Sequence, residues 1–213
     1  MKSDTLFMNI SSDEVVISDW EMNDFLHRND VEKTLGPKLV ELVHEWLYKN
    51  IMVLNWPGWF TNLRVGTLCL NILNAVLESP VSIYDISKID LYKKVYEKWI
   101  LPKLWIIYIG QKRNIWLWDF EKNEKIWQYS FDELKEKIES SIFLDEVADK
   151  NYYPVWLNKQ TKVRILFDWD KLNIDYCGKI TTFSLNELVE NPSNIITPNY
   201  MMDPSITISN SII

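Results

Sequence analysis

The feature that most constrains the fold of this 213-residue chain is a change in its hydrophobic period near Pro102. From about residue 19 to 101, apolar residues recur every three to four positions, as they do on amphipathic helices. After Pro102 they form short runs of aromatic and β-branched residues, which are typical of strands. A run of helices followed by a run of strands favours an α+β fold. We therefore predict a helical N-terminal part of three to four helices, followed by a mainly antiparallel β-sheet with two short capped helices.

Helices are predicted over residues 36–50, 59–78 and 87–101, with "SDWE" (18–21) as a capping box that starts an earlier one. The stretch "NWPGWF" (55–60) separates the first two, because Pro and Gly together interrupt helices. The helix over 59–78 has apolar residues on most faces, so we expect it to be central and buried.

Two short sequences in the second half are nearly alike, "LWDFEK" at 117–122 and "LFDWDK" at 166–171. Each ends a predicted strand and precedes a polar turn, and each is followed by a Ser-x-x-Glu capping box, at 130–133 and 184–187. This pattern predicts two β-hairpin–helix units in one continuous sheet.

The chain divides into three predicted regions. Residues 1–18 form an acidic N-terminal segment, and 19–190 form a single compact domain that is helical over 19–102 and β-rich over 103–190. Residues 191–213 contain three prolines, so a disordered tail is expected there, although "SITIS" could form a strand.

Composition excludes several classes of protein. Hydrophobic residues make up 47% of the chain, which is ordinary for a globular protein. The two cysteines are too few for a disulfide framework, which favours a reducing compartment. The longest apolar run, 65–77, is too short to span a bilayer. We therefore expect a cytoplasmic protein. The five glycines never cluster into a phosphate loop, and the two histidines lack a recognisable catalytic partner. We predict no enzyme activity and no cofactor.

Charge and aromatic residues indicate candidate binding positions. The net charge is −7, and residues 1–30 hold seven acidic residues against two basic ones. This negative charge disfavours nucleic acid as a partner and favours a basic protein. An acidic terminus that is only solvated, without any partner, would have the same sequence pattern. The loop at 55–60 could be a recognition tip or a lid folded onto the core. The candidate binding residues are Asp13, Glu14, Asp19, Glu21, Trp56 and Trp59.

The acids of the two repeated sequences are the alternative candidate, as oxygen ligands for a metal ion. On strands they would lie opposite the aromatic side chains, which also fits structural acids on a wet sheet face. The candidate metal ligands are Asp119, Glu121, Asp168 and Asp170, with Glu124 and Asp175 nearby.

An acidic, Trp-rich, Gly-poor α+β protein without catalytic signatures resembles bacterial immunity proteins. The resemblance implies a non-catalytic binding module that inhibits or sequesters a protein partner such as a basic toxin, with neither nucleic acid nor membrane as partner. The alternative is a metal-dependent hydrolase or nuclease that uses the clustered carboxylates.

Overall fold

The computed structural model describes residues 4–12, 14–19, 22–27, 29–46, 48–58, 60–108, 115–129, 142–145, 162–189 and 191–198. Within these ranges the protein is a mixed α/β structure that consists mostly of strands. The predicted helical N-terminal part is wrong, because five strands are interleaved with the helices of that region.

The first sheet has the strand order β3-β2-β1-β4-β5. Its strands are β1 (Thr5–Asn9), β2 (Glu14–Ser18), β3 (Asn23–His27), β4 (Asn50–Asn55) and β5 (Ser82–Ser87). Strands β1, β4 and β5 are parallel, whereas β2 is antiparallel to both of its neighbours. The predicted acidic N-terminal segment therefore contains the central strand of this sheet. The predicted capping box at 18–21 falls at the end of β2 and starts no helix.

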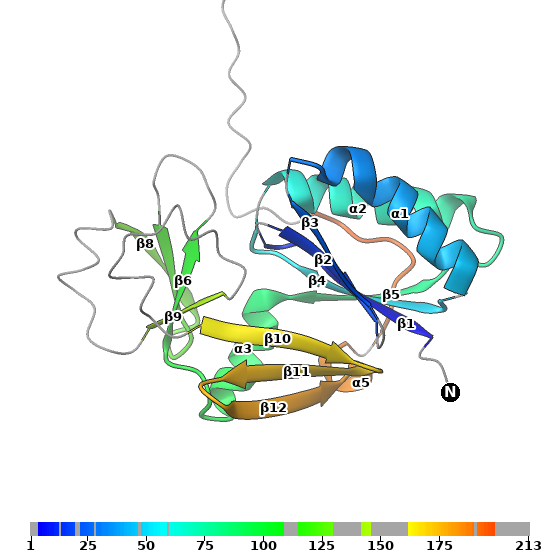
Figure 1. Cartoon of the computed structure of the whole chain (residues 1–213). Coiled ribbons are helices and arrows are strands. Elements are labelled where there is room, and N and C mark those ends of the chain that lie inside the picture. Colours follow the sequence, from blue (N-terminus) through cyan, green and yellow to red (C-terminus); the bar gives the residue numbers. More distant parts are fainter. Residues whose placement is uncertain are drawn as a thin grey trace, which may run out of the picture.

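Helices α1 (Val31–Trp46) and α2 (Phe60–Val76) cover one face of this sheet, and helix α3 (Lys88–Glu97) lies on the other (Figure 1). All five residues of β1 are buried because both faces of the sheet are covered. Leu6 and Met8 belong to the apolar cluster under α1 and α2, while Phe7 belongs to the cluster on the opposite side. The period of two along a strand thus sends alternate side chains into two separate cores.

The second sheet has the strand order β12-β11-β10-β9-β6-β7-β8. It contains β6 (Leu104–Tyr108), β7 (Ile115–Asp119), β8 (Glu124–Tyr129), β9 (Ile142–Asp145), β10 (Lys162–Asp168), β11 (Lys171–Tyr176) and β12 (Lys179–Ser184). Strand β9 joins two antiparallel groups, pairing in parallel with β6 on one side and β10 on the other. Helix α5 (Leu185–Leu188) is a single turn after β12.

The two sheets repeat one topology. The order β8-β7-β6-β9-β10, with β7 antiparallel to both neighbours and β6, β9 and β10 parallel, reproduces β3-β2-β1-β4-β5. The two similar sequences do lie in one sheet, on β7 and β10. They occupy different places in the repeated unit, since β7 corresponds to β2 and β10 to β5. The two similar sequences therefore mark only the ends of hairpin strands. The structural repeat relates β3-β2-β1-β4-β5 to β8-β7-β6-β9-β10 and does not bring the two sequences into corresponding places.

Two further predictions concern the helix caps and the tail. Glu187 accepts hydrogen bonds from the backbone N–H and the hydroxyl of Ser184, which confirms the box at 184–187. The box at 130–133 lies outside the described residues, as do residues 199–213. Residues 191–198 are part of the fold, because Ser193 pairs with Ile83 and Ile196 is buried, so the disordered tail is wrong for this stretch.

Candidate functional site

The predicted binding residues at the N-terminus do not form one exposed acidic surface in the described part of the chain. Glu14 is half-buried at the start of β2, and Asp13 and Glu21 lie outside the described residues. Asp19 is 5% exposed, and its carboxylate accepts hydrogen bonds from the Tyr48 hydroxyl and the Met22 amide. Asp19 therefore holds the turn between β2 and β3.

The aromatic loop after β4 folds onto the protein. Trp56 is half-buried and packs against both apolar clusters, which supports the lid interpretation for this residue. Trp59 lies outside the described residues. Gly58 brings the loop against the β1–β2 turn, since a Cβ there would be 2.1 Å from the Ser11 carbonyl oxygen.

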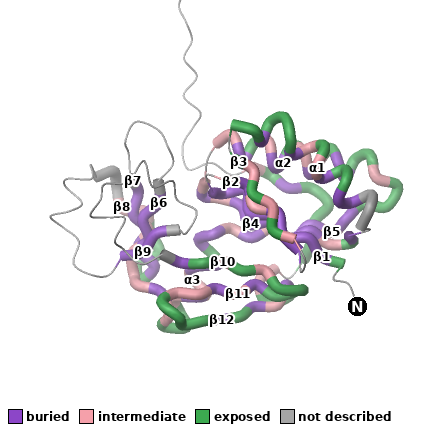
Figure 2. Tube along the Cα trace, in the orientation of Figure 1, coloured by how far each residue is buried: buried purple, intermediate pink, exposed green. Residues whose placement is uncertain are grey.

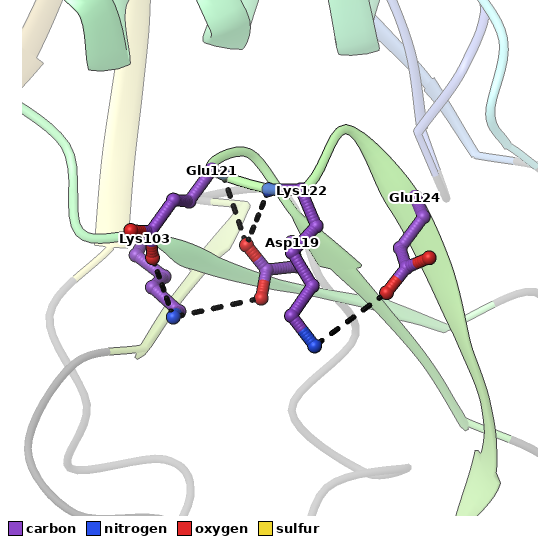
Figure 3. A network of polar contacts seen from close by, with 5 residues as sticks. All are labelled: Lys103, Asp119, Glu121, Lys122 and Glu124. Atoms are coloured by element: carbon purple, nitrogen blue, oxygen red, sulfur yellow. Dashed lines mark hydrogen bonds and ion pairs between the residues drawn. The ribbon is translucent and has the colours of Figure 1, made fainter.

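The candidate metal ligands are separated into two structural roles. Asp119 is 2% exposed, so the predicted wet sheet face is wrong for it. Its carboxylate accepts the backbone N–H groups of Glu121 and Lys122 at 3.0 and 3.1 Å, and so closes the β7–β8 turn (Figure 3). The Lys103 ammonium lies 2.7 Å from Glu121 and 3.7 Å from Asp119, and both carboxylates raise the pKa of that lysine.

Asp168 and Asp170 are exposed at the β10–β11 turn, on a different hairpin from Asp119 and Glu121. In the described residues, no group of three or more His, Cys, Asp or Glu side chains could hold a metal ion. The hypothesis of a hydrolase with converging carboxylates therefore has no support from this geometry.

A polar cluster instead lies at the carboxyl ends of the parallel strands β1, β4 and β5. Asn9 ends β1, and its side-chain oxygen accepts the backbone N–H and the hydroxyl of Ser11. The Ser12 hydroxyl accepts hydrogen bonds from Asn9 Nδ2 at 3.1 Å and from the ammonium of Lys88, at the start of α3, at 2.8 Å. In open α/β sheets, ligands bind outside the carboxyl ends of the strands.

Asp85, on β5, lies close to this edge of the sheet. Its burial raises the pKa of the carboxyl group from 3.8 to about 6, and a hydrogen bond with the Asn55 side chain partly offsets that effect. Its Oδ1 atom is buried without a hydrogen-bond partner among the described residues. The aspartate therefore destabilises the fold when it is ionised.

The outer side of α1 and α2 carries exposed apolar side chains, which no charge or motif signal in the sequence had singled out. Leu68, Ile72 and Val76 are 56%, 53% and 71% exposed and follow one another at four-residue intervals on α2. Residues at this spacing lie on the same face of a helix. Figure 2 shows exposed and half-buried residues along both helices, whereas the central strands β1 and β4 of the sheet are almost entirely buried. The prediction that the helix over 59–78 is central and buried is wrong for this face.

Two contacts fix how this face continues onto α1. Glu32 and Arg64 form an ion pair at 3.4 Å, and a Cβ added to Gly36 would lie 3.6 Å from the Cys69 sulfur. In both pairs the α2 residue follows its α1 partner by nearly the same number of positions, so α1 and α2 run side by side in the same direction. The next position on the α1 stripe is Val40, which is 56% exposed and falls beside the apolar stripe of α2. We call Val40, Leu68, Ile72 and Val76 the α1–α2 apolar face.

Comparison with known proteins gives only distant likenesses. No family model and no curated protein matches the chain. A solved structure of YeaZ from Pseudomonas aeruginosa has 16% identity and a TM-score of 0.39, with 59% of this chain and 64% of that one covered. A structure described as similar to the peptidase YEAZ from Pseudomonas aeruginosa has 16% identity and a TM-score of 0.38, with 68% of this chain and 76% of that one covered.

The chain thus spans about 64% of the length of the first of these structures. Both structures are described as YeaZ or as similar to YEAZ, so the comparisons give no support to the predicted immunity-type inhibitor. In the described residues, no helix is long and apolar enough to cross a membrane.

Proposed function

We propose that this chain is a subunit of a protein assembly and docks a different protein on the α1–α2 apolar face. The observation that carries the proposal is the continuous exposure of Val40, Leu68, Ile72 and Val76 on two adjacent helices. Single exposed apolar residues are normal on a protein surface, but a contiguous apolar patch marks an interaction site. The role needs no catalytic step and no cofactor, and a cytoplasmic location remains part of the proposal.

The shape of the face suits a helical partner. Leu68 to Val76 covers about 12 Å along α2, at 1.5 Å per residue. Gly36 adds no side chain where α1 meets α2 beside Cys69. An amphipathic helix binds an apolar surface of this kind through apolar residues at three- and four-residue spacing. A second copy of this chain is the less favoured occupant, because each copy carries a net charge of −7.

The test is affinity purification of the tagged full-length protein from its own host, comparing wild type with two charged variants. Ile72→Asp places a carboxylate in the middle of the face. Ile180→Asp, on the edge strand β12, is the matched control because Ile180 is 62% exposed but lies elsewhere. A stoichiometric partner should be retained by wild type and Ile180→Asp and lost with Ile72→Asp.

The affinity for that partner should then be measured by calorimetry, with thermal unfolding as a check on folding. The loss at a hot-spot position is about 2 kcal/mol or more, which is roughly a thirtyfold weaker Kd. Equal retention by the two variants would contradict the proposal. So would a stable homodimer that Ile72→Asp dissociates, since the occupant would then be a second copy.

A further inference from the structure

We propose that Trp99, directly after helix α3, is an anchor residue that inserts its ring into an apolar pocket of a partner protein. Trp99 is 85% exposed, the highest value among the exposed large apolar side chains of the described residues. Helix α3 lies on the face of the first sheet opposite α1 and α2 (Figure 1). The contact is therefore separate from the α1–α2 apolar face and does not rest on the function proposed for that face.

The backbone of Trp99 is held in a conformation that favours glycine. Helix α3 ends in a Schellman motif, in which the Trp99 N–H donates to the Tyr96 carbonyl at 2.8 Å and the Ile100 N–H donates to the Val95 carbonyl at 3.4 Å. The residue after the C-cap of this motif is left-handed and is usually Gly, because a Cβ is disfavoured there. Trp99 follows the C-cap Lys98 and has a φ of 60°. For so bulky a residue this conformation is strained.

Exposure of the ring is a second cost on the same residue. Aromatic side chains bury about 150–250 Å² each when they are enclosed, so an exposed indole forgoes a large hydrophobic gain. Among the described residues, the Trp99 indole has neither a hydrogen bond nor a ring contact. Strained residues cluster at functional sites, where the surrounding structure holds them in place. Strain and exposure together therefore indicate that the ring has its role outside this chain.

The surroundings of Trp99 indicate what kind of partner fits it. Glu97 and Lys98 are exposed, so the ring is a single apolar projection beside charged residues. A central aromatic anchor with a polar rim is the usual arrangement of a protein–protein hot spot. A buried indole N–H needs an acceptor, so the partner's pocket should be apolar with a carbonyl or carboxylate oxygen at its end. A lipid surface is disfavoured, because interfacial binding takes several apolar side chains on one face.

Two variants of the full-length protein separate strain from binding. Trp99→Gly should raise the melting temperature by about 2–4 °C, because Gly takes a positive φ without steric cost. Trp99→Ala should change the melting temperature little, because Ala keeps the Cβ that causes the strain. Both variants should lose the partner, since both lack the indole. A lower melting temperature for Trp99→Gly would overturn the proposal, because the ring would then be a contact of the fold itself.

The contact itself is located with the photo-crosslinker p-benzoyl-phenylalanine, placed at position 99 of the full-length protein in its own host. Irradiation should link position 99 to one protein. The same probe at position 195 should not give this product, because Ile195 is 69% exposed but lies beside the edge strand β5 of the first sheet.

Calorimetry with the crosslinked protein, once purified, then measures the contribution of the ring. Trp99→Ala should weaken the Kd at least about thirtyfold, as the loss of a hot-spot side chain does, and Trp99→Phe should weaken it less. Ile72→Asp, on the opposite face of the first sheet, should leave this Kd unchanged. Absence of a crosslink at position 99, or equal binding by Trp99→Ala and wild type, would overturn the proposal. So would sedimentation with vesicles of phosphatidylcholine and phosphatidylserine that Trp99→Ala abolishes, since the ring would then bind lipid.

Discussion

Replacement of Asp85 by Asn should stabilise the protein at neutral pH and leave its stability in acid nearly unchanged. In the folded state, burial raises the pKa of Asp85 from 3.8 to about 6. Between these two values the folded protein binds more protons than the unfolded chain does, so the free energy of unfolding falls as pH rises. Above about pH 6 the penalty is complete, and below about pH 4 it is absent.

The size of the effect follows from the shift. A difference of about two pKa units corresponds to about 3 kcal/mol, at 1.36 kcal/mol per unit. Asp85→Asn removes the charge and keeps a side chain of the same shape beside Asn55. The variant should therefore gain up to about 3 kcal/mol over wild type at pH 7 to 8, and the gain should shrink to near zero at pH 4.

Urea unfolding of both proteins at several values between pH 4 and 8 measures this difference directly, because titrations common to both proteins cancel. Asp168→Asn is the matched control, since Asp168 is exposed at the end of β10 and its replacement should change stability by less than about 0.5 kcal/mol. A gain for Asp85→Asn that stays constant from pH 4 to 8 would refute the reasoning. So would a loss of stability at pH 7.

Three other substitutions test contacts that hold the fold together. Asn74→Ala should cost about 3 kcal/mol in urea unfolding, because it leaves both the N–H and the carbonyl of Val81 without their buried partner. Gly58→Ala should lower the melting temperature by several degrees, because its Cβ would lie 2.1 Å from the Ser11 carbonyl oxygen. Ser184→Ala should cost about 1 kcal/mol, because it removes the capping hydroxyl that donates to Glu187, and this too is read from urea midpoints.

Each of these has a control in the same chain. Asn186→Ala replaces an exposed residue of α5 and should be nearly neutral, so it is the reference for both Asn74 and Ser184. Gly36→Ala adds a Cβ at an ordinary contact distance of 3.6 Å and should be tolerated where Gly58→Ala is not. If Asn74→Ala or Ser184→Ala lowers the free energy of unfolding no more than Asn186→Ala does, the contacts given for that residue are contradicted.

Sequence patterns predicted the regular elements that are long or strongly periodic. The helices over 36–50, 59–78 and 87–101 correspond to α1, α2 and α3, and β7 and β10 lie where the two similar sequences predicted strands. The strand β4 was missed because it is short, buried and parallel. Such strands are brief apolar runs without alternation, so between two helices they read as linkers.

The functional surfaces were harder to predict, for two physical reasons. Leu68, Ile72 and Val76 lie on a helix that is apolar on most faces, and nothing in such a pattern tells which face lacks a neighbour in the folded protein. Lys88 is an ordinary charged residue in the sequence. Its burial arises from contact with Ser12, which is 76 positions away, and no local pattern reports a contact of that range.

A single strand separates the two apolar cores on either side of the first sheet. Along β1, Leu6 and Met8 point into the core beneath α1 and α2, whereas Phe7 belongs to the core on the opposite side. A substitution such as Phe7→Leu should therefore leave binding of a partner at Ile72 unchanged, which calorimetry with that partner would measure. Weaker partner binding by Phe7→Leu would contradict this independence and show that the two faces of the sheet are coupled.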